Sequence, residues 1–210
     1  MALDEALLES GVRLNSPILR FYGWTKAAAS FGYFQHYLDV EKATRLRPLV
    51  RRPTGGGLVP HDCDWTYSAV FPPNHPWYSL SAVESYQQIH EWIQRAFGRL
   101  KIATELASCC LKSGPGQCFV GYEKFDLLWH GKKIAGAAQR RTKAGLLIQG
   151  SIQPPPLSLN RADWEAAMLA SVPEEVSASA KALNADDRLR ERAEHLAQQK
   201  YSQTAFNQRR

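Results

Sequence analysis

The sequence predicts an α+β domain built on a mixed or antiparallel β-sheet flanked by helices. Segments with helical periodicity are mixed with strand-like segments instead of alternating strictly with them, as they would in a doubly wound nucleotide-binding fold. The 210 residues, 44% of them hydrophobic and 10% aromatic, suffice for one sizeable core. We expect residues 1–157 to form the main domain, and residues 158–210 to form a C-terminal helical segment packed on the same domain.

The N-terminal segment is expected to be a helix that leads into a strand. Leu3, Leu7 and Leu8 recur at helical spacing before Ser10-Gly11, a pair that ends a helix. Residues 17–24 then alternate between apolar and polar side chains, which predicts a strand.

A second group of elements follows in residues 26–73. The small and aromatic segment 26–35 suits a strand in which Gly32 lets another backbone or a ligand approach closely. Residues 37–52 predict a polar connecting helix and the start of another strand. Three glycines at 55–57 interrupt this strand, and the alternation resumes over residues 58–73.

One long helix and a three-stranded meander make up the next part of the predicted fold. Ser81 and Glu84 form a capping box at the start of a helix that extends to Leu100. Residues 125–153 then predict three strands joined by a tight turn at His130-Gly131 and a second turn near 143–145.

The C-terminal part is expected to be helical. Prolines at 154–156 close the sheet region because proline cannot donate to a strand ladder. Asn160 caps a helix over 160–170, and a second helix is expected from about 186 to 206.

The basic charge points to an acidic protein partner more than to nucleic acid. The net charge is +6 and the pI is near 9.2. The basic residues are dispersed except for four pairs, three of them beside the motifs described below, and no aromatic platform is interleaved with them. The pairs are Arg51-Arg52, Lys132-Lys133, Arg140-Arg141 and Arg209-Arg210.

Cysteine spacing and hydropathy indicate a soluble cytoplasmic protein. Cys63, Cys109, Cys110 and Cys118 form no CxxC pair, which argues against a zinc site or a disulfide framework, so we expect reduced thiols and no metal. The sequence has no apolar run of the roughly 20 residues needed to span a bilayer, and its start resembles an acidic amphipathic helix and not a signal peptide.

The first candidate site motif is RRPTGGGLVPHD, residues 51–62. Gly55, Gly56 and Gly57 would expose backbone N–H groups and leave room for a ligand, with Arg51 and His61 nearby. A glycine-rich hairpin without a ligand explains the glycines equally well, and a lone histidine in a strand is more often a hydrogen-bonded structural residue than a catalyst.

The second motif is GKKIAGAAQRR, residues 131–141. It places Lys133 on a strand near Gly136 and Ala138, two small residues that leave a groove. A lysine in such a groove can orient an acyl carbonyl, and its partial burial would favour proton transfer. A solvated lysine in a turn, like the neighbouring Lys132, is the alternative.

The third candidate is Cys118 in GPGQCFVGY, after a Gly-Pro-Gly stretch. Its thiolate could act as a nucleophile and carry an acyl group as a thioester, favoured by an ammonium such as that of Lys133. A buried and inert thiol is the usual alternative, and Cys109 and Cys110, beside apolar residues, fit it better.

Taken together, these motifs resemble the lipoate-protein ligase and octanoyltransferase family, which belongs to the biotin/lipoate protein ligase superfamily. The resemblance covers about residues 1–153, from MALDEALLE through ILRFYGW, SFGYFQ and RRPTGGGLVPHD to GKKIAGAAQRR and GSI. It implies an α+β catalytic domain over residues 1–157 whose mixed sheets enclose a groove for a linear acyl chain.

The resemblance also implies roles for individual residues. Arg51, the three glycines 55–57 and His61 would line the acyl or acyl-adenylate site, and Lys133 would contact the acyl carbonyl. In the cysteine-dependent transferases a cysteine shortly upstream of that lysine accepts the acyl group, and Cys118 occupies that position. Gln149 stands where many relatives have histidine, and glutamine cannot titrate.

The function that this resemblance implies is octanoyl or lipoyl transfer without a cofactor. The donor would be an acyl carrier protein thioester, and the acceptor a lysine of a lipoyl domain or of glycine-cleavage H protein. Cys118 and the short C-terminal segment favour this interpretation over a ligase that uses ATP and Mg and makes lipoyl-AMP. An amidotransferase between carrier proteins and an inactive acyl-binding module are further alternatives, and nucleic-acid binding ranks last.

Overall fold

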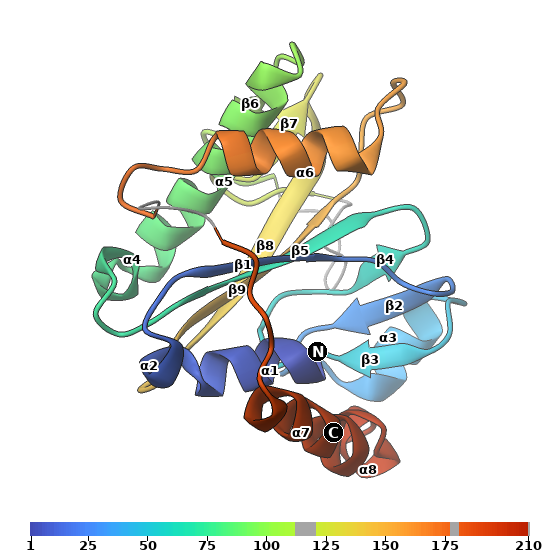
Figure 1. The fold of residues 1–210 in the computed structure, drawn as a ribbon. Helices are drawn as coiled ribbons and strands as arrows, with labels where there is room; N and C mark the ends of the chain where they lie inside the picture. Colours follow the sequence, from blue (N-terminus) through green and yellow to red (C-terminus); the bar gives the residue numbers. More distant parts are fainter. Residues whose placement is uncertain (112–120, 177–180, 210) are drawn as a thin grey trace.

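The computed structural model describes residues 1–111, 121–176 and 181–209. Within them, six strands form an antiparallel sheet in the order β1–β5–β9–β8–β7–β6, which runs through the middle of the molecule (Figure 1). The strands, in sheet order, are β1 (Ile18–Tyr22), β5 (Trp65–Phe71), β9 (Gly145–Ile152), β8 (Lys132–Thr142), β7 (Leu127–Trp129) and β6 (Glu105–Leu106). The β7–β8–β9 meander matches the sequence prediction.

A smaller sheet of three described strands lies beside the large one (Figure 1). Strand β2 (Ala28–Phe31) pairs in parallel with β3 (Leu49–Arg51) and antiparallel with β4 (Val59–His61). The predicted α+β class with mixed and antiparallel sheets is therefore confirmed.

The alternating segment 58–73 does not form one strand. It divides into β4, in the small sheet, and β5, in the large sheet. The break falls at 62–64, where the Cys63 N–H is 3.1 Å from the Asp62 carboxylate that accepts its hydrogen bond. This local side-chain bond offers the backbone an alternative to a strand ladder, so alternation on both sides of the break does not make one strand.

Most helices form where the sequence predicts them. The capping box of α5 is present, and the Asn160 side chain caps α6. The helix expected over 186–206 is divided into α7, a π-helical turn η1 and α8. The described helices are α1 (Ala2–Glu9), α2 (Gly11–Leu14), α3 (Tyr37–Ala43), α4 (Pro76–Ser79), α5 (Ala82–Arg99), α6 (Arg161–Ala170), α7 (Asp187–Leu196), η1 (Ala197–Tyr201) and α8 (Thr204–Asn207).

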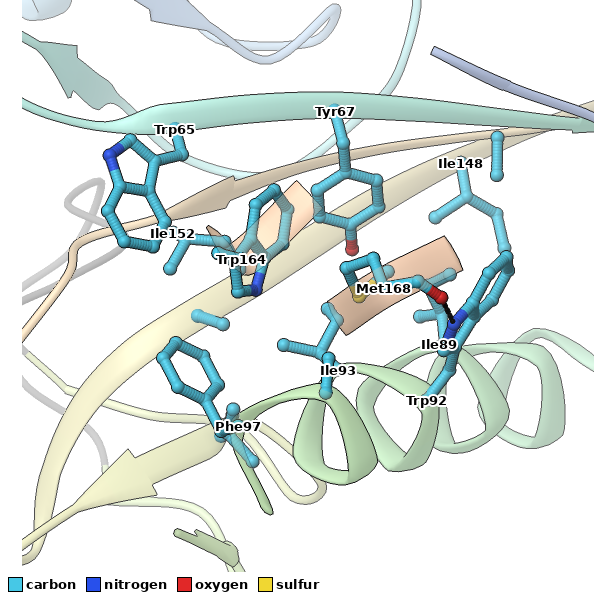
Figure 2. Close-up of a cluster of buried hydrophobic side chains, with 14 of the residues drawn as sticks. Trp65, Tyr67, Ile89, Trp92, Ile93, Phe97, Ile148, Ile152, Trp164 and Met168 are labelled. Carbon is cyan, nitrogen blue, oxygen red and sulfur yellow. Dashed lines mark hydrogen bonds between the residues drawn. The ribbon is translucent and has the colours of Figure 1, made fainter. Parts of the chain in front are cut away.

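The large sheet buries apolar side chains on both faces. On β5, Tyr67, Ala69 and Phe71 belong to the main core, which α5 and α6 cover. Figure 2 shows Tyr67 pointing into this core. The intervening Val70 points to the opposite face, where it packs with Leu7 and Leu8 of α1 and with Leu189 and Leu196 of α7. This period of two is what pleated strands impose, and it leaves the polar residues of β5 and β9 on the α1 face.

The C-terminal helices lie on opposite faces of the large sheet. Helix α6 packs on α5, and the indole of Trp92 donates to the Met168 carbonyl over 2.8 Å (Figure 2). Helix α7 packs on α1, and α8 reaches β3 of the small sheet. The segment after residue 158 therefore contributes to both cores. The predicted boundary between residues 1–157 and 158–210 stays a prediction.

Candidate active site

A pocket lies between the α1 face of the large sheet and the small sheet. About 460 Å³ of space free of protein atoms lies in it, part of it open to solvent. The large sheet contributes Tyr22, Thr66, Lys133, Gly136, Ala137, Ala138, Gln149, Gly150 and Ser151, and the small sheet with its loop contributes Ser30, Arg52, Gly56, Val59 and His61; Met1 also lines it.

The small residues of β8 and β9 make room in this wall. Gly136 pairs with Ser151, and Ala138 pairs with Gln149 across the β8–β9 ladder. Gly150 is required for a different reason, because a Cβ there would lie 2.2 Å from Cζ of the buried Tyr67 on the other face of the sheet. The groove predicted beside Lys133 is therefore present.

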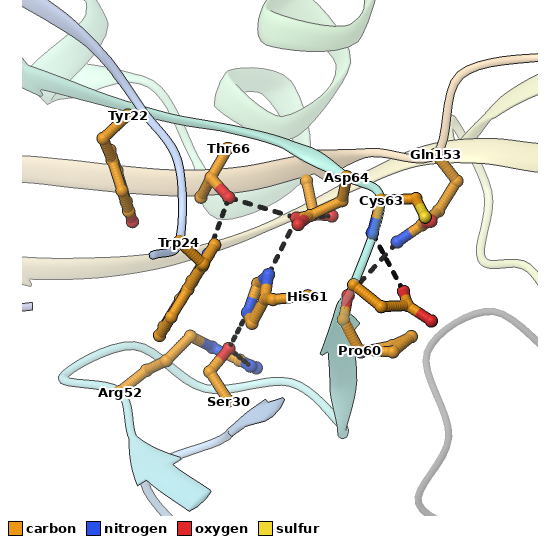
Figure 3. A network of polar contacts seen from close by, with 12 residues as sticks. Tyr22, Trp24, Ser30, Arg52, Pro60, His61, Cys63, Asp64, Thr66 and Gln153 are labelled. Carbon is orange, nitrogen blue, oxygen red and sulfur yellow. Dashed lines mark hydrogen bonds and ion pairs between the residues drawn. The ribbon is translucent and has the colours of Figure 1, made fainter. Parts of the chain in front are cut away.

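A chain of buried polar groups holds His61 in the pocket wall (Figure 3). Its Nε2 lies 2.6 Å from Ser30 Oγ, and its Nδ1 lies 2.8 Å from Asp64 Oδ2. Trp24 stacks on the imidazole at 4.1 Å between ring centroids. All these bonds are satisfied when Ser30 donates to Nε2 and Nδ1 donates to Asp64. Both nitrogens of the His61 imidazole are engaged in these hydrogen bonds, so the rest of the ring is what His61 presents to the pocket.

Arg52 ties this chain to the glycine-rich loop. Its Nη1 donates to Ser30 Oγ over 2.9 Å, and its Nη2 donates to the carbonyls of Gly55 and Gly57 over 2.9 and 2.8 Å. The loop also packs against the small sheet at Gly32, where a Cβ would meet the Gly56 carbonyl oxygen at 1.9 Å. The close backbone approach predicted at Gly32 is confirmed.

Lys133 lies in the pocket wall with a buried carboxylate as partner. Its Nζ is 2.7 Å from Asp126 Oδ2, and the two side chains are 8% and 0% exposed. The Tyr86 hydroxyl and the Glu123 N–H also donate to Asp126, the second over 2.6 Å. Burial and the nearby Asp126 raise the pKa of Tyr86 well above its ordinary value, so its phenol stays protonated.

Gln149 joins the glycine-rich loop to helix α1. Its Oε1 accepts from Thr54 Oγ1 over 2.8 Å, and its Nε2 donates to Asp4 Oδ2 over 2.7 Å. Asp4 is fully buried and pairs with Arg20 at 2.6 Å. Burial by itself raises the pKa of Asp4, but nearby positive charges, Arg20 among them, and hydrogen bonds from Ser68 and Gln149 lower it overall. The amide thus serves as a structural link at this position.

The structure brings most of the predicted site residues together. Lys133, Gly136, Ala138, His61 and Gly56 line one pocket. The carbonyls of Gly55 and Gly57 accept hydrogen bonds from Arg52, which lines the pocket. Cys118 is outside the described residues, so its role stays a prediction.

Arg51, the other predicted site residue, points away from the pocket. Its buried guanidinium donates to the carbonyls of Tyr33 and Gln35 over 2.7 and 2.8 Å. It also donates to the C-terminal carbonyls of Phe206 and Asn207, each over 3.2 Å. The expectation that Arg51 lines the site is therefore corrected, because neighbouring residues of an extended chain point to opposite sides, and Arg52 takes that place.

Sequence reasoning passed over several polar residues of the site. Ser30, Asp64 and Asp126 are single polar residues in or beside apolar strands, and a buried carboxylate requires a partner. A lone aspartate at the start of the apolar β7 strand was the signal for Asp126. The spacing of three residues from His61 was the signal for Asp64.

In the described part of the chain, the remaining cysteines form no disulfide and no metal-binding cluster is present. Cys63, Cys109 and Cys110 are exposed free thiols, which contradicts the expectation that Cys109 and Cys110 are buried. No three His, Cys, Asp or Glu side chains among residues 1–111, 121–176 and 181–209 are placed to share a metal ion. In the same ranges no helix has both the length and the hydropathy to cross a membrane.

Solved structures define the class of fold. The protein Ta0514 of T. acidophilum with bound lipoic acid superposes with a TM-score of 0.81 at 22% identity, covering 99% of this chain and 91% of that one. A lipoate-protein ligase A bound with ATP gives a TM-score of 0.82 at 22% identity and covers 99% and 92%. This chain therefore has the lipoate ligase fold.

The sequence itself shows the family. A family model described as lipoyl protein ligase A/B catalytic domain matches residues 1–176, and the chain belongs to this family. Similar curated proteins are the octanoyltransferases LipM of Bacillus subtilis, 38% identical over 165 residues, and of Lysinibacillus sphaericus, 39% identical over 166 residues. Each match covers 72% of this chain but 59% and 60% of those relatives, so the chain spans about three fifths of their length.

Proposed function

We propose that this chain transfers an octanoyl or lipoyl group from the thioester of an acyl carrier protein to a lysine of a lipoyl domain or of glycine-cleavage H protein. The observation that carries the proposal is the pocket in which Lys133 lies beside the small residues Gly136 and Ala138. The similarity to octanoyltransferases at 36–39% identity supports the choice of acyl group and of transfer over ligation.

The proposed reaction has two steps. The Cys118 thiolate attacks the carbonyl of the donor thioester, a new thioester forms on the enzyme, and the carrier leaves as a thiolate that takes a proton from water. The ε-amine of the acceptor lysine then attacks this thioester, an amide forms, and the Cys118 thiol is regenerated while the amine loses its proton. The ammonium of Lys133 would stabilise both the thiolate and the oxyanion that develops in each step.

The pocket wall explains how an acyl chain would be recognised. The glycine and alanines of β8 leave space along the sheet, and each buried CH₂ contributes about 0.8 kcal/mol. Two carbons therefore change binding by somewhat over 1 kcal/mol. This discriminates moderately by length.

The partners and conditions follow from the same proposal. Carrier proteins of this kind are typically acidic, and a net charge of +6 would attract them. We place the reaction in the cytoplasm, with no cofactor in the transfer itself. ATP and Mg would be needed if the chain were a ligase instead.

The test compares donors under defined conditions. The chain is incubated with an apo lipoyl domain and one of three donors: octanoyl carrier protein, octanoate or lipoate with ATP and Mg²⁺, or a lipoylated H protein. The proposal predicts amide formation with the carrier thioester in the absence of ATP. Product only with ATP would establish a ligase, product only from the lipoylated protein an amidotransferase, and binding without product an inactive module.

A further inference from the structure

The pair formed by Lys133 and Asp126 is the feature of the pocket that the family resemblance left unexplained. Asp126 directly precedes β7, and Lys133 is in β8 after the tight turn, so the β-hairpin brings the two residues together. The carboxylate is fully buried and lies 2.7 Å from Nζ. A buried carboxylate is costly unless it is paired and hydrogen-bonded.

The buried Asp126 carboxylate is surrounded by hydrogen-bond donors. Three donors converge on it: the Lys133 ammonium, the Tyr86 hydroxyl and the Glu123 N–H. Hydrogen bonds to a carboxylate stabilise the ionised form. Because the Tyr86 phenol has a pKa well above its ordinary value, first through burial and then through Asp126, it donates and does not compete for the proton.

The fold also reserves space for the Lys133 side chain. A Cβ on Gly136 would lie 2.7 Å from Cε and 2.9 Å from Nζ of Lys133, and 3.3 Å from Asp126 Oδ1. Glycine at this position therefore leaves room for the end of the Lys133 side chain to lie against the strand beside Asp126. The result is an ammonium held in a defined place in the pocket wall.

We infer that Asp126 is the positioning residue that keeps Lys133 protonated and fixed in the pocket, so that Lys133 acts as a fixed positive charge and not as a proton acceptor. The inference deepens the proposed function and rests on it for the role of that charge. In the alternative, Lys133 is a neutral amine that removes a proton. This would require that the buried Asp126 carboxylate, 2.7 Å away, fail to stabilise the protonated amine.

The other titratable and charged groups around this pair come from several elements. They are Tyr86 and His90 of α5, Tyr67 of β5, His61 of β4, and Arg52 after β3. Burial lowers the pKa of His90 to about 4 and raises that of Tyr67, so both are neutral near pH 7. Arg52 is cationic and, because it lines the same pocket from the side of the small sheet, would oppose a second cation. Asp126 supplies the negative charge that counters this repulsion.

The test measures the protonation of Lys133 directly. The whole chain is treated with trace acetic anhydride over a range of pH, and acetylation of Lys133 and of the adjacent, exposed Lys132 is read by peptide mass spectrometry. The inference predicts that the native Lys133 reaches half of its maximal labelling at the same pH as Lys132 or a higher one. A half-labelling pH clearly below that of Lys132 would overturn it.

Variants extend the test to Asp126. Asp126→Asn should lower the half-labelling pH of Lys133 by one unit or more, a tenfold change in basicity, and leave Lys132 unchanged. Tyr86→Phe disturbs the same buried cluster but keeps the charge pair, so it should shift Lys133 much less. An equal shift in both variants, or none in Asp126→Asn, would refute the positioning role.

These measurements need no turnover, so they separate this inference from the proposed function. If Asp126→Asn does not fold, as circular dichroism would reveal, the labelling of the native chain still decides. If Lys133 labels as predicted while no acyl transfer is found, the inference about its charge stands and the proposed function fails.

Discussion

Replacing Gly136 by alanine should displace the Lys133 ammonium while leaving the fold in place. The new Cβ would lie 2.7 Å from Cε and 2.9 Å from Nζ, whereas ordinary contact begins at 3.4 Å. The difference shows that the end of the lysine must retreat by 0.5 to 0.7 Å. Because the atoms that clash belong to the far end of a flexible side chain, the cost in stability should be about 1 kcal/mol, the low end for overpacking.

The effect on acyl transfer should be much larger than the effect on stability. A misplacement of about 1 Å in a catalytic group costs on the order of 100-fold in rate, so Gly136→Ala should slow transfer roughly 10- to 100-fold. The assay is single-turnover acylation of the chain by octanoyl carrier protein, with thermal unfolding measured in parallel.

Gly98→Ala is the matched control for this substitution. Gly98 is exposed in α5, and nothing lies within 4 Å of the Cβ that alanine would add. This variant should transfer at the native rate. A folded Gly136→Ala protein with native transfer rates would refute the reasoning that the ammonium must occupy its observed place.

Three further predictions concern stability. Gly150→Ala brings a Cβ to 2.2 Å from the buried Tyr67 ring and should cost about 1–3 kcal/mol, which lowers Tm by roughly 2–4 °C per kcal/mol; an unchanged Tm would contradict the packing described here. Arg51→Ala removes the guanidinium that binds the C-terminal carbonyls and should cost about 2–4 kcal/mol, with faster proteolysis near residue 206; native protease resistance would be the opposing result. Burial raises the pKa of Glu5, but hydrogen bonds and charge from Lys200, with Tyr201 and Arg140, lower it overall from 4.5. The stability that the Glu5 carboxylate contributes is therefore present above about pH 4.5 and is lost as the pH falls further. Glu5→Gln should lower the free energy of unfolding by about 1–3 kcal/mol near neutral pH and by progressively less in acid. A loss of stability that does not change with pH would contradict this prediction.

The elements that the sequence predicted correctly have local signals. The capping box at Ser81 and Glu84 fixes the start of α5, and the turn at His130-Gly131 fixes the β7–β8 hairpin through two residues with positive φ. Such signals are complete within a few residues. They require no knowledge of what packs against them.

The predictions failed where contacts between distant parts of the chain determine the local structure. Residues 58–73 alternate throughout, yet the chain leaves one sheet and enters another at 62–64, a change that periodicity does not encode. Arg51 and Arg52 are adjacent, and the face of the strand decides which one reaches the pocket. The predicted C-terminal helix is divided into three pieces. In this region Lys200 and Tyr201 donate to Glu5, and the Phe206 carbonyl of α8 accepts a hydrogen bond from Arg51.

The candidate site was predictable in outline but not in its pairings. His61, Lys133 and the glycines were identified from their motifs, and the structure places Lys133, His61 and Gly56 around one pocket. Asp126 was missed because its importance comes from a partner seven residues away across a hairpin. Gln149, which raised the alternative of an inactive module, links Thr54 to Asp4 without needing to titrate.

The covalent intermediate is the central claim, and intact-mass analysis tests it most directly. The native chain and Cys118→Ala are each incubated with octanoyl carrier protein and weighed before and after neutral hydroxylamine. We predict one octanoyl group on the native chain, removed by hydroxylamine, and none on Cys118→Ala. A hydroxylamine-labile octanoyl group that persists in Cys118→Ala would contradict the account.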